Sequence, residues 1–143
     1  NYIEVPINII NIEGDGFHLI AEGMINNKPA RFVVDTGASR TVFDKDRILN
    51  YIDNPEFNEK EGISAGIGGT DLSSFIFNIE ELSFGNLIIN DYQAVAMDLS
   101  NVNNSYAMLK IPPIDGVLGG DLMKKHQTVI NYKLKKMRLT PKH

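Results

Sequence analysis

The chain alternates short apolar runs with clusters of Gly, Pro, Asn and Asp, a pattern that predicts strands joined by turns. Short strands at such spacing are typical of an all-β sandwich or barrel-like fold. The predicted strands are 2–12, 17–25, 30–35, 41–43, 75–79, 82–84, 87–89, 92–97, 128–132 and 137–139. Short helical segments are expected at 44–52, 106–111 and 122–126, and the segment 100–105 has a loop-like composition.

The predicted strand at 30–35 ends in a single carboxylate, Asp35, which is followed by Thr36, Gly37 and Ala38. A charge at the end of a buried strand costs free energy unless hydrogen bonds or a partner stabilise it. Thr36 brings a hydroxyl, Gly37 lets backbone amides approach closely, and Ala38 leaves room above the carboxylate. Asp-Thr-Gly alone is also an ordinary turn sequence. The apolar residues on both sides favour a functional site.

A second informative stretch, 61–71, is rich in glycine around Gly66, Ile67, Gly68 and Gly69. A phosphate-binding loop would need a following Lys-Ser or Lys-Thr and a helix, and the sequence has neither at this point. The stretch therefore predicts a hairpin with a glycine tip, because glycine bends at low cost and exposes backbone amides. The tip is either an ordinary hairpin turn or a mobile flap over a ligand.

A third stretch, 114–123, places Gly119 after an apolar pair and Asp121 shortly afterwards. Gly119 permits a close approach of another backbone segment. Asp121 is positioned to cap the helix expected at 122–126. This stretch predicts a packed turn that leads into a short helix.

The composition of the chain argues against several classes of function. The 143 residues suffice for one domain, 1–143, and 43% hydrophobic content supports a core without disulfides or metals. A net charge of −4 provides no basic field for nucleic acid or an anionic membrane. The chain has no Cys, and its three His are not spaced to share a metal, so no cofactor or metal is expected.

Taken in order, the loop around Asp35, the tip at 66–69 and the turn at 117–119 resemble the motifs of retropepsin-like aspartic proteases, single-lobe and of bacterial type. The resemblance implies a closed or barrel-like acid-protease lobe with a flap hairpin and one or two short helices. It also implies an aspartic endopeptidase acting on polypeptides. The implied site residues are Asp35 (catalytic), Thr36, Gly37 and Ala38 (active-site support), Gly66, Ile67, Gly68 and Gly69 (flap), Ile114 and Val117 (substrate pocket), and Leu118, Gly119 and Asp121 (second motif).

The mechanism of such enzymes uses two carboxylates that share one proton, and this chain has one Asp-Thr-Gly. The resemblance therefore implies a C2 homodimer in which the Asp35 side chains of the two subunits lie side by side. It also implies that Thr36 hydrogen-bonds across the axis and stabilises the two loops. It also suggests a hydrogen bond from Asp121 towards Thr41. Because Ala38 has no hydroxyl to stabilise carboxylate charge, the activity optimum is expected at weakly acidic or neutral pH.

Two positions depart from the retroviral pattern. Ser39 and Gly120 stand where charged residues pair between subunits, so the dimer contacts must be made differently. An internal pairing of Asp35 with Asp115 is an alternative, although Asp115 lacks the following Thr and the preceding strand.

Other functions remain open from the sequence. A non-catalytic peptide-binding or dimerisation module could keep the same fold. A glycosidase would need a second placed acid, which the sequence does not provide. The chain begins at Asn1 without Met, which is compatible with a removed signal peptide or anchor and an exported or periplasmic location, as well as with a cytoplasmic one.

Overall fold

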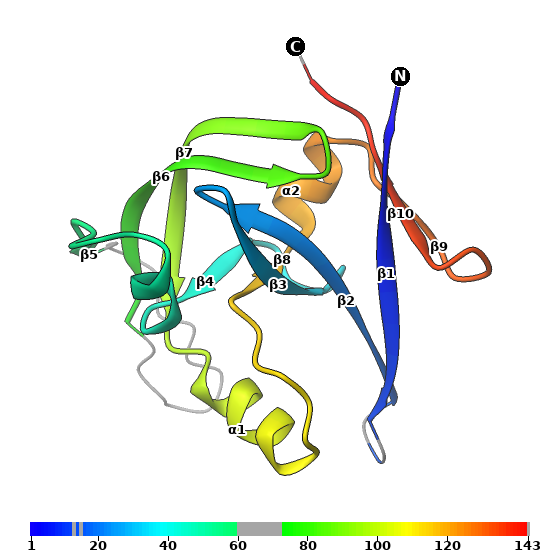
Figure 1. Cartoon of the computed structure of the whole chain (residues 1–143), viewed down its shortest axis with the longest axis horizontal. Helices are drawn as coiled ribbons and strands as arrows, with labels where there is room; N and C mark the ends of the chain where they lie inside the picture. The colour runs from blue at the N-terminus through cyan, green and yellow to red at the C-terminus, as the bar shows by residue number, and fades with distance from the viewer. Residues whose placement is uncertain (13, 15, 60–72, 143) are drawn as a thin grey trace.

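The computed structural model describes residues 1–12, 14, 16–59 and 73–142, and the elements in these residues are mostly strands (Figure 1). In chain order the elements are β1 (Ile3–Ile12), β2 (Gly16–Ile25), β3 (Lys28–Val34), β4 (Val42–Asp44), the 3-10 helix η1 (Arg47–Asn50), β5 (Asn58–Glu59), β6 (Phe75–Phe84), β7 (Leu87–Met97), α1 (Ser100–Met108), β8 (Gly116–Leu118), α2 (Gly120–Lys125), β9 (Val129–Asn131) and β10 (Lys136–Leu139).

Six strands close into a mixed barrel in the order β2-β3-β8-β4-β7-β6, and β6 returns to β2 through the pairs Met24↔Ser83 and Ile25↔Leu82. The pairs β3–β8 and β4–β7 are parallel, and the others in the barrel are antiparallel. Strand β8, which comes late in the chain, thus lies between two early strands. The predicted barrel-like, mainly-β fold with two short α-helices is confirmed.

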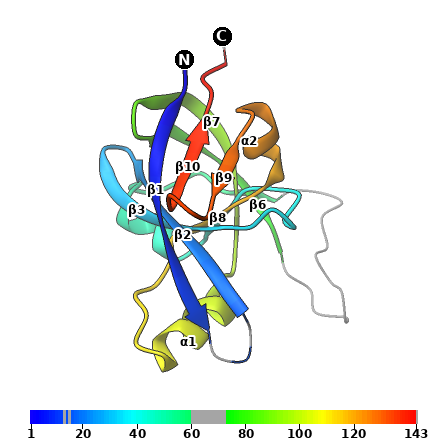
Figure 2. The same cartoon turned by 90° about the vertical axis from the view of Figure 1, so that its right-hand side faces the viewer.

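The first and last strands extend the sheet beyond the barrel, as Figure 2 shows for β1, β10 and β9. Strand β1 pairs with β10 through Ile3–Pro6 and with β2 through Ile7–Ile12. Pro6 lacks a backbone N–H and lies where β1 changes partners, which is a position that needs fewer ladder hydrogen bonds. The end hairpin of β9 and β10 matches the predicted strands at 128–132 and 137–139.

Two hydrophobic clusters form the core. The larger cluster fills the barrel, and its aromatic rings meet edge to face: the centroids of Phe32 and Phe43 are 5.8 Å apart, and those of Phe43 and Phe77 are 5.9 Å apart. The smaller cluster packs Tyr106 of α1 against Ile20 of β2 and its neighbours. Helix α1 therefore covers a second apolar surface outside the barrel.

The hairpin that precedes Asp35 forms as predicted, because Asn26 and Asn27 both adopt positive φ (49° and 65°), as a type I′ turn requires. The four strands predicted between 75 and 97 are instead two long ones, β6 and β7. Asp91, predicted as part of a turn, does have a positive φ of 50°, but pairing with β6 continues on both sides of it.

Helix α1 corrects the prediction of a loop at 100–105. The Ser100 hydroxyl and, next, the Ser100 N–H, which donates to the Asp98 carboxylate at 2.8 Å, lower the pKa of Asp98. Asn103 bonds both the N–H and the C=O of Ile114, at 2.8 and 3.0 Å. These bonds and the burial of Tyr106 override the poor helix propensity of the segment. Among the described residues, no helix is both long and apolar enough to cross a membrane.

Substitution of Gly23 by Ala is expected to weaken the barrel where β2 meets β6. A Cβ at Gly23 would lie 2.7 Å from Ser83 O and 2.8 Å from Phe84 Cε1. We expect a loss of about 1–3 kcal/mol in the free energy of unfolding, measured by urea denaturation. The control Met24→Ala, at the exposed neighbouring position, should stay within about 0.5 kcal/mol. Equal stability of the two variants would contradict the importance of this contact.

Candidate active site

Asp35 lies directly after β3, where the strand leaves the barrel, and its side chain is exposed. Its backbone N–H donates to Leu118 O at 2.9 Å, which continues the pairing of β3 with β8. The Asp35 carboxylate oxygen Oδ1 accepts a hydrogen bond from Gly37 N (2.9 Å), and Asp35 O accepts one from Ala38 N (3.2 Å). The loop therefore holds the carboxylate at the surface through its own backbone.

Gly37 keeps the space beside the carboxylate open. A Cβ at this position would lie 3.3 Å from Asp35 Oδ1, closer than most such contacts. Thr36 is exposed between Asp35 and Gly37. A larger residue at this position would have to displace the Asp35 carboxylate by a few tenths of an ångström.

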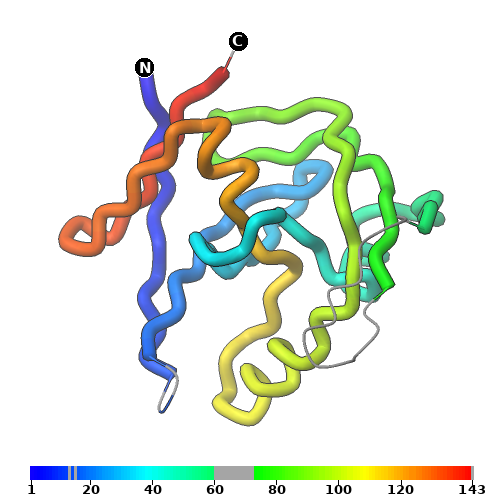
Figure 3. Tube along the Cα trace, turned by 180° about the vertical axis from the view of Figure 1, so that it is seen from behind, coloured from blue at the N-terminus to red at the C-terminus, as the bar shows by residue number. Residues whose placement is uncertain are grey.

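The second motif packs against this loop, as predicted for Gly119. A Cβ on Gly119 would lie 2.5 Å from the backbone carbon of Arg40 and 2.6 Å from its oxygen, so no larger residue fits. Gly119 N donates to Thr41 Oγ1 at 2.9 Å, and Gly120 N donates to Ala38 O at 2.7 Å. In Figure 3 the loop after Asp35 (cyan) passes beside the start of α2 (orange).

Asp121 supports the same loop. Its Oδ1 accepts hydrogen bonds from Thr41 N (2.9 Å), from Thr41 Oγ1 (2.7 Å) and from Leu122 N (2.8 Å). The contact with Thr41 is the one that the resemblance suggested. The predicted capping role needs correction, because α2 begins at Gly120 with Gly119 at the cap position, and Asp121 lies in the first turn.

Tyr92 is a neighbour of this cluster that the sequence did not reveal. Burial and, next, the Asp121 carboxylate raise the pKa of the Tyr92 hydroxyl to about 12, although Arg40 and a hydrogen bond with Thr41 oppose the shift. Tyr92 therefore carries a neutral hydroxyl beside Thr41 at physiological pH. The parallel pairing of β7 with β4 brings Tyr92 close to Thr41, and no local sequence pattern predicts that pairing.

Asp35 lines a depression of about 500 Å³ that extends over β2, β3 and the β9 segment. His18 belongs to this lining, and its Nδ1 lies 2.7 Å from the Tyr106 hydroxyl. The residues that line the depression are Phe17, His18, Leu19, Val33, Val34, Asp35, Thr36, Ile130 and Tyr132.

The two residues predicted for a substrate pocket lie in different environments. Ile114 is 0% exposed within the smaller core cluster, so it does not reach a surface where substrate binds, and its predicted pocket role is corrected. It is held inside by the two bonds that its backbone makes with Asn103. Val117 is half-buried in the middle of β8, and its role stays a prediction.

Asp115 lies far from Asp35, at the opposite end of the parallel pair β3–β8. Its carboxylate accepts hydrogen bonds from Arg31 N (2.9 Å) and Arg47 Nε (2.8 Å). Arg31 precedes Asp35 by four positions on β3, which corresponds to roughly 13 Å along the strand. Asp115 is also 2% exposed. The structure therefore does not bring Asp35 and Asp115 together within one chain.

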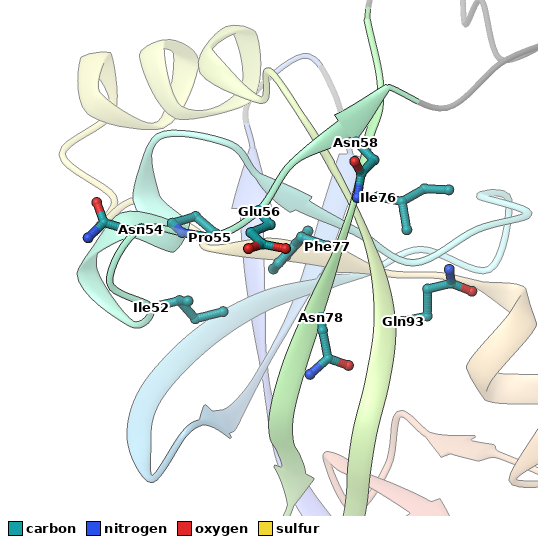
Figure 4. A pocket seen from close by; sticks show the side chains of 9 residues that line it. All are labelled: Ile52, Asn54, Pro55, Glu56, Asn58, Ile76, Phe77, Asn78 and Gln93. Atoms are coloured by element: carbon teal, nitrogen blue, oxygen red, sulfur yellow. The ribbon is translucent and has the colours of Figure 1, made fainter.

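The predicted flap residues Gly66, Ile67, Gly68 and Gly69 lie outside the described residues. A separate hollow of about 470 Å³ lies beside β5, β6 and β7 (Figure 4). Among the described residues, its lining combines four carboxamide side chains, four apolar residues and one carboxylate, Glu56. The lining residues are Ile52, Asn54, Pro55, Glu56, Asn58, Ile76, Phe77, Asn78 and Gln93. Over the part of the chain that the structure describes, no cluster of three or more His, Cys, Asp or Glu is arranged to hold a metal.

Solved structures share this architecture. A retropepsin-like aspartic protease from Rickettsia conorii matches with a TM-score of 0.56 and 16% identity, covering 97% of this chain and 90% of that one. The EIAV protease, in complex with the inhibitor HBY-793, matches with a TM-score of 0.53 and 16% identity, covering 80% and 92%. At these identities the likeness concerns the fold.

The sequence itself matches a family model. The model of the aspartyl protease family covers residues 21–122, a range that includes Asp35 and Asp121. A comparison with curated proteins gives no match. The matched range runs from within β2 to the start of α2 and contains the loop after Asp35 and the segment that packs against it, so this chain belongs to the aspartyl protease family and has a retropepsin-like fold.

Proposed function

We propose that this chain is an aspartic endopeptidase that hydrolyses peptide bonds as a homodimer, with Asp35 of each subunit forming the catalytic pair. The observation that carries the proposal is an exposed carboxylate at the end of a buried strand, in a loop fixed by Thr41, Gly119 and Asp121. Membership of the aspartyl protease family supports it.

The proposed reaction needs two carboxylates in different protonation states. The ionised Asp35 takes a proton from a water molecule, whose oxygen attacks the carbonyl carbon of the substrate. The protonated Asp35 of the partner donates a hydrogen bond to the carbonyl oxygen. The tetrahedral intermediate then collapses: the C–N bond breaks, the amine leaves with a proton, and a carboxylic acid and an amine are the products.

The need for a second subunit follows from the lining of the depression. Among the described residues that line the depression, Asp35 is the only carboxylate. Asp115 is committed to Arg47 and Arg31 at the other end of the barrel strands. A C2 axis beside Asp35 supplies the second carboxylate without any further residue. Thr36, exposed next to Asp35, is placed to contact the partner loop, and residues 66–69 are predicted to cover the substrate.

Substitution of Asp35 by Asn is expected to abolish cleavage, because Asn neither accepts a proton from water nor shares one with its mate. We expect kcat/KM to fall by at least about 10³-fold. The measurement is cleavage of a mixed peptide library, followed by mass spectrometry. The matched control is Asp46→Asn, an exposed carboxylate before η1, which should keep activity within about twofold.

Equal activity of the Asp35→Asn variant and the wild type would exclude Asp35 as the catalytic group. A folded wild-type chain that binds pepstatin-type inhibitors or dimerises but cleaves no peptide would instead identify a non-catalytic peptide-binding or dimerisation module.

Substitution of Ala38 by Ser is expected to move the pH–rate profile to lower pH. An added hydroxyl stabilises carboxylate charge, so the active pair loses its first proton at lower pH, and the acidic limb of the profile should shift in that direction. The check is kcat/KM measured between about pH 3 and 8 for the wild type and the variant. An unchanged or alkaline-shifted acidic limb would contradict this role of position 38.

A further inference from the structure

Tyr92 lies at the end of the barrel where the loop after Asp35 packs. Strands β4 and β7 run parallel, with Phe43 opposite Ala96 (Figure 1). Residues 92, 94 and 96 of β7 share one face of the strand, and Ala94 and Ala96 are both fully buried inside the barrel. Tyr92 points inward from the same face, one step before these alanines, and it is half-buried.

Apolar packing holds the ring of Tyr92. Its centroid lies 6.3 Å from that of Phe43, with the two ring planes at 64°. In the ladder between β6 and β7, Tyr92 is opposite the fully buried Ile79. The hydroxyl extends beyond these contacts to Thr41, with which it forms a hydrogen bond.

The hydroxyl of Thr41 can make three hydrogen bonds, because it donates one proton and accepts two. Its proton goes to Asp121 Oδ1, 2.7 Å away, and Gly119 N donates to it at 2.9 Å. One acceptor position is then left for Tyr92. Since Thr41 has no second proton to give, the Tyr92 hydroxyl is the donor in the bond between them.

The charges around Tyr92 keep this donor protonated. Burial and, next, the Asp121 carboxylate raise the pKa of Tyr92 to about 12, against the effect of Arg40. The hydrogen bonds therefore run in one direction at neutral pH, from Tyr92 through Thr41 to Asp121. Successive bonds in one direction strengthen one another, and the last acceptor here is a carboxylate, which makes strong hydrogen bonds.

These bonds support the loop that carries Asp35. Thr41 closes that loop, and its N–H also donates to Asp121 Oδ1, at 2.9 Å. Gly120 N donates to Ala38 O at 2.7 Å, within the same loop. The position of Thr41 therefore decides how the loop lies against the second motif, and Tyr92 is the contact that Thr41 makes with β7.

We propose that Tyr92 is a positioning residue of the candidate active site: its hydroxyl completes the hydrogen bonds of Thr41 and thereby fixes the loop after Asp35 against Gly119. The inference rests on the proposed function, because it assigns Tyr92 to the alignment of the Asp35 carboxylate for catalysis. Tyr92 acts through Thr41 and exchanges no proton with the substrate.

The first test is the activity of Tyr92→Phe, which removes the hydroxyl and keeps the ring. A loop that is held less firmly presents Asp35 in the reactive geometry less often, whereas the substrate binds as before. We expect kcat to fall by about tenfold and KM to change less than about twofold. The measurement is steady-state cleavage of a peptide that the wild type hydrolyses.

Tyr51→Phe is the matched control. The Tyr51 hydroxyl donates to Pro29 O at 2.8 Å, and Pro29 lies near the start of β3, at the other end of the strand from Asp35. This substitution therefore removes a tyrosine hydrogen bond of the barrel far from the loop. Its kcat should stay within about twofold of the wild type. Equal kcat values of Tyr92→Phe and Tyr51→Phe overturn the proposal.

Amide hydrogen exchange, measured by NMR, tests the same contact without activity. The amide of Gly119, which donates to Thr41 Oγ1, should exchange about tenfold faster in Tyr92→Phe than in the wild type. The amide of Leu99, which donates to Asp44 Oδ1 at 2.8 Å, should not change. Unchanged exchange at Gly119 in a folded Tyr92→Phe variant overturns the proposal.

The wild type alone decides the matter if Tyr92→Phe does not fold. The Tyr92 hydroxyl proton should then give a slowly exchanging NMR resonance with a nuclear Overhauser effect to the Thr41 methyl group. A Tyr92 hydroxyl that exchanges as fast as that of the exposed Tyr132 overturns the proposal.

The outcomes separate this inference from the proposed function. If the wild type cleaves no peptide, but Tyr92→Phe accelerates exchange at Gly119 and Tyr51→Phe does not, the peptidase is overturned and the role of Tyr92 in fixing the loop is retained. Asp35-dependent cleavage with the same kcat in Tyr92→Phe and the wild type retains the peptidase and overturns the inference.

Discussion

The buried hydroxyl of Thr41 holds together two chain segments that are almost eighty residues apart. It accepts a hydrogen bond from Gly119 N and donates one to Asp121 Oδ1. Both bonds are possible because Gly119 has no side chain and so lets its backbone touch that of Arg40. The shape of the loop after Asp35, and hence the direction of its carboxylate, depends on this contact. A carboxylate that projects from the end of a strand is thus positioned by groups in a segment almost eighty residues away.

Two aspartates at the ends of neighbouring strands illustrate how environment decides the role of a carboxylate. Asp115 is buried and accepts hydrogen bonds from Arg31 N and Arg47 Nε. Both of its carboxylate oxygens are therefore engaged in bonds that hold β8 in place. Asp35 is exposed, and its carboxylate accepts a hydrogen bond from the N–H of Gly37. The exposed environment suits the role proposed for Asp35, because a buried ion pair resists any change of its charge.

Much of this fold could be predicted from local sequence, and the failures have physical causes. The turn at Asn26-Asn27 was predictable because its chemistry is local. Helix α1 was not, since Asn103 and Tyr106 gain their partners only in the folded chain. The loop at Asp35 and the close approach at Gly119 could also be predicted, because the small residues at these positions indicate them directly. The burial of Ile114 and the position of Tyr92 depend on strand order, which no stretch of sequence encodes by itself.

The pairing of β1 with β10 has a mechanical consequence. Because Ile3 lies opposite Leu139 in an antiparallel pair, the two ends of the paired region leave the sheet at the same point. A force that pulls them apart loads the bonds between these strands one after another, as in opening a zipper, rather than all at once. The sheet beyond the barrel should peel before the barrel opens. A force on either chain end would thus separate β10 from β1. Strand β9, which pairs with β10, would leave the sheet with it, while the loop that carries Asp35 is still folded.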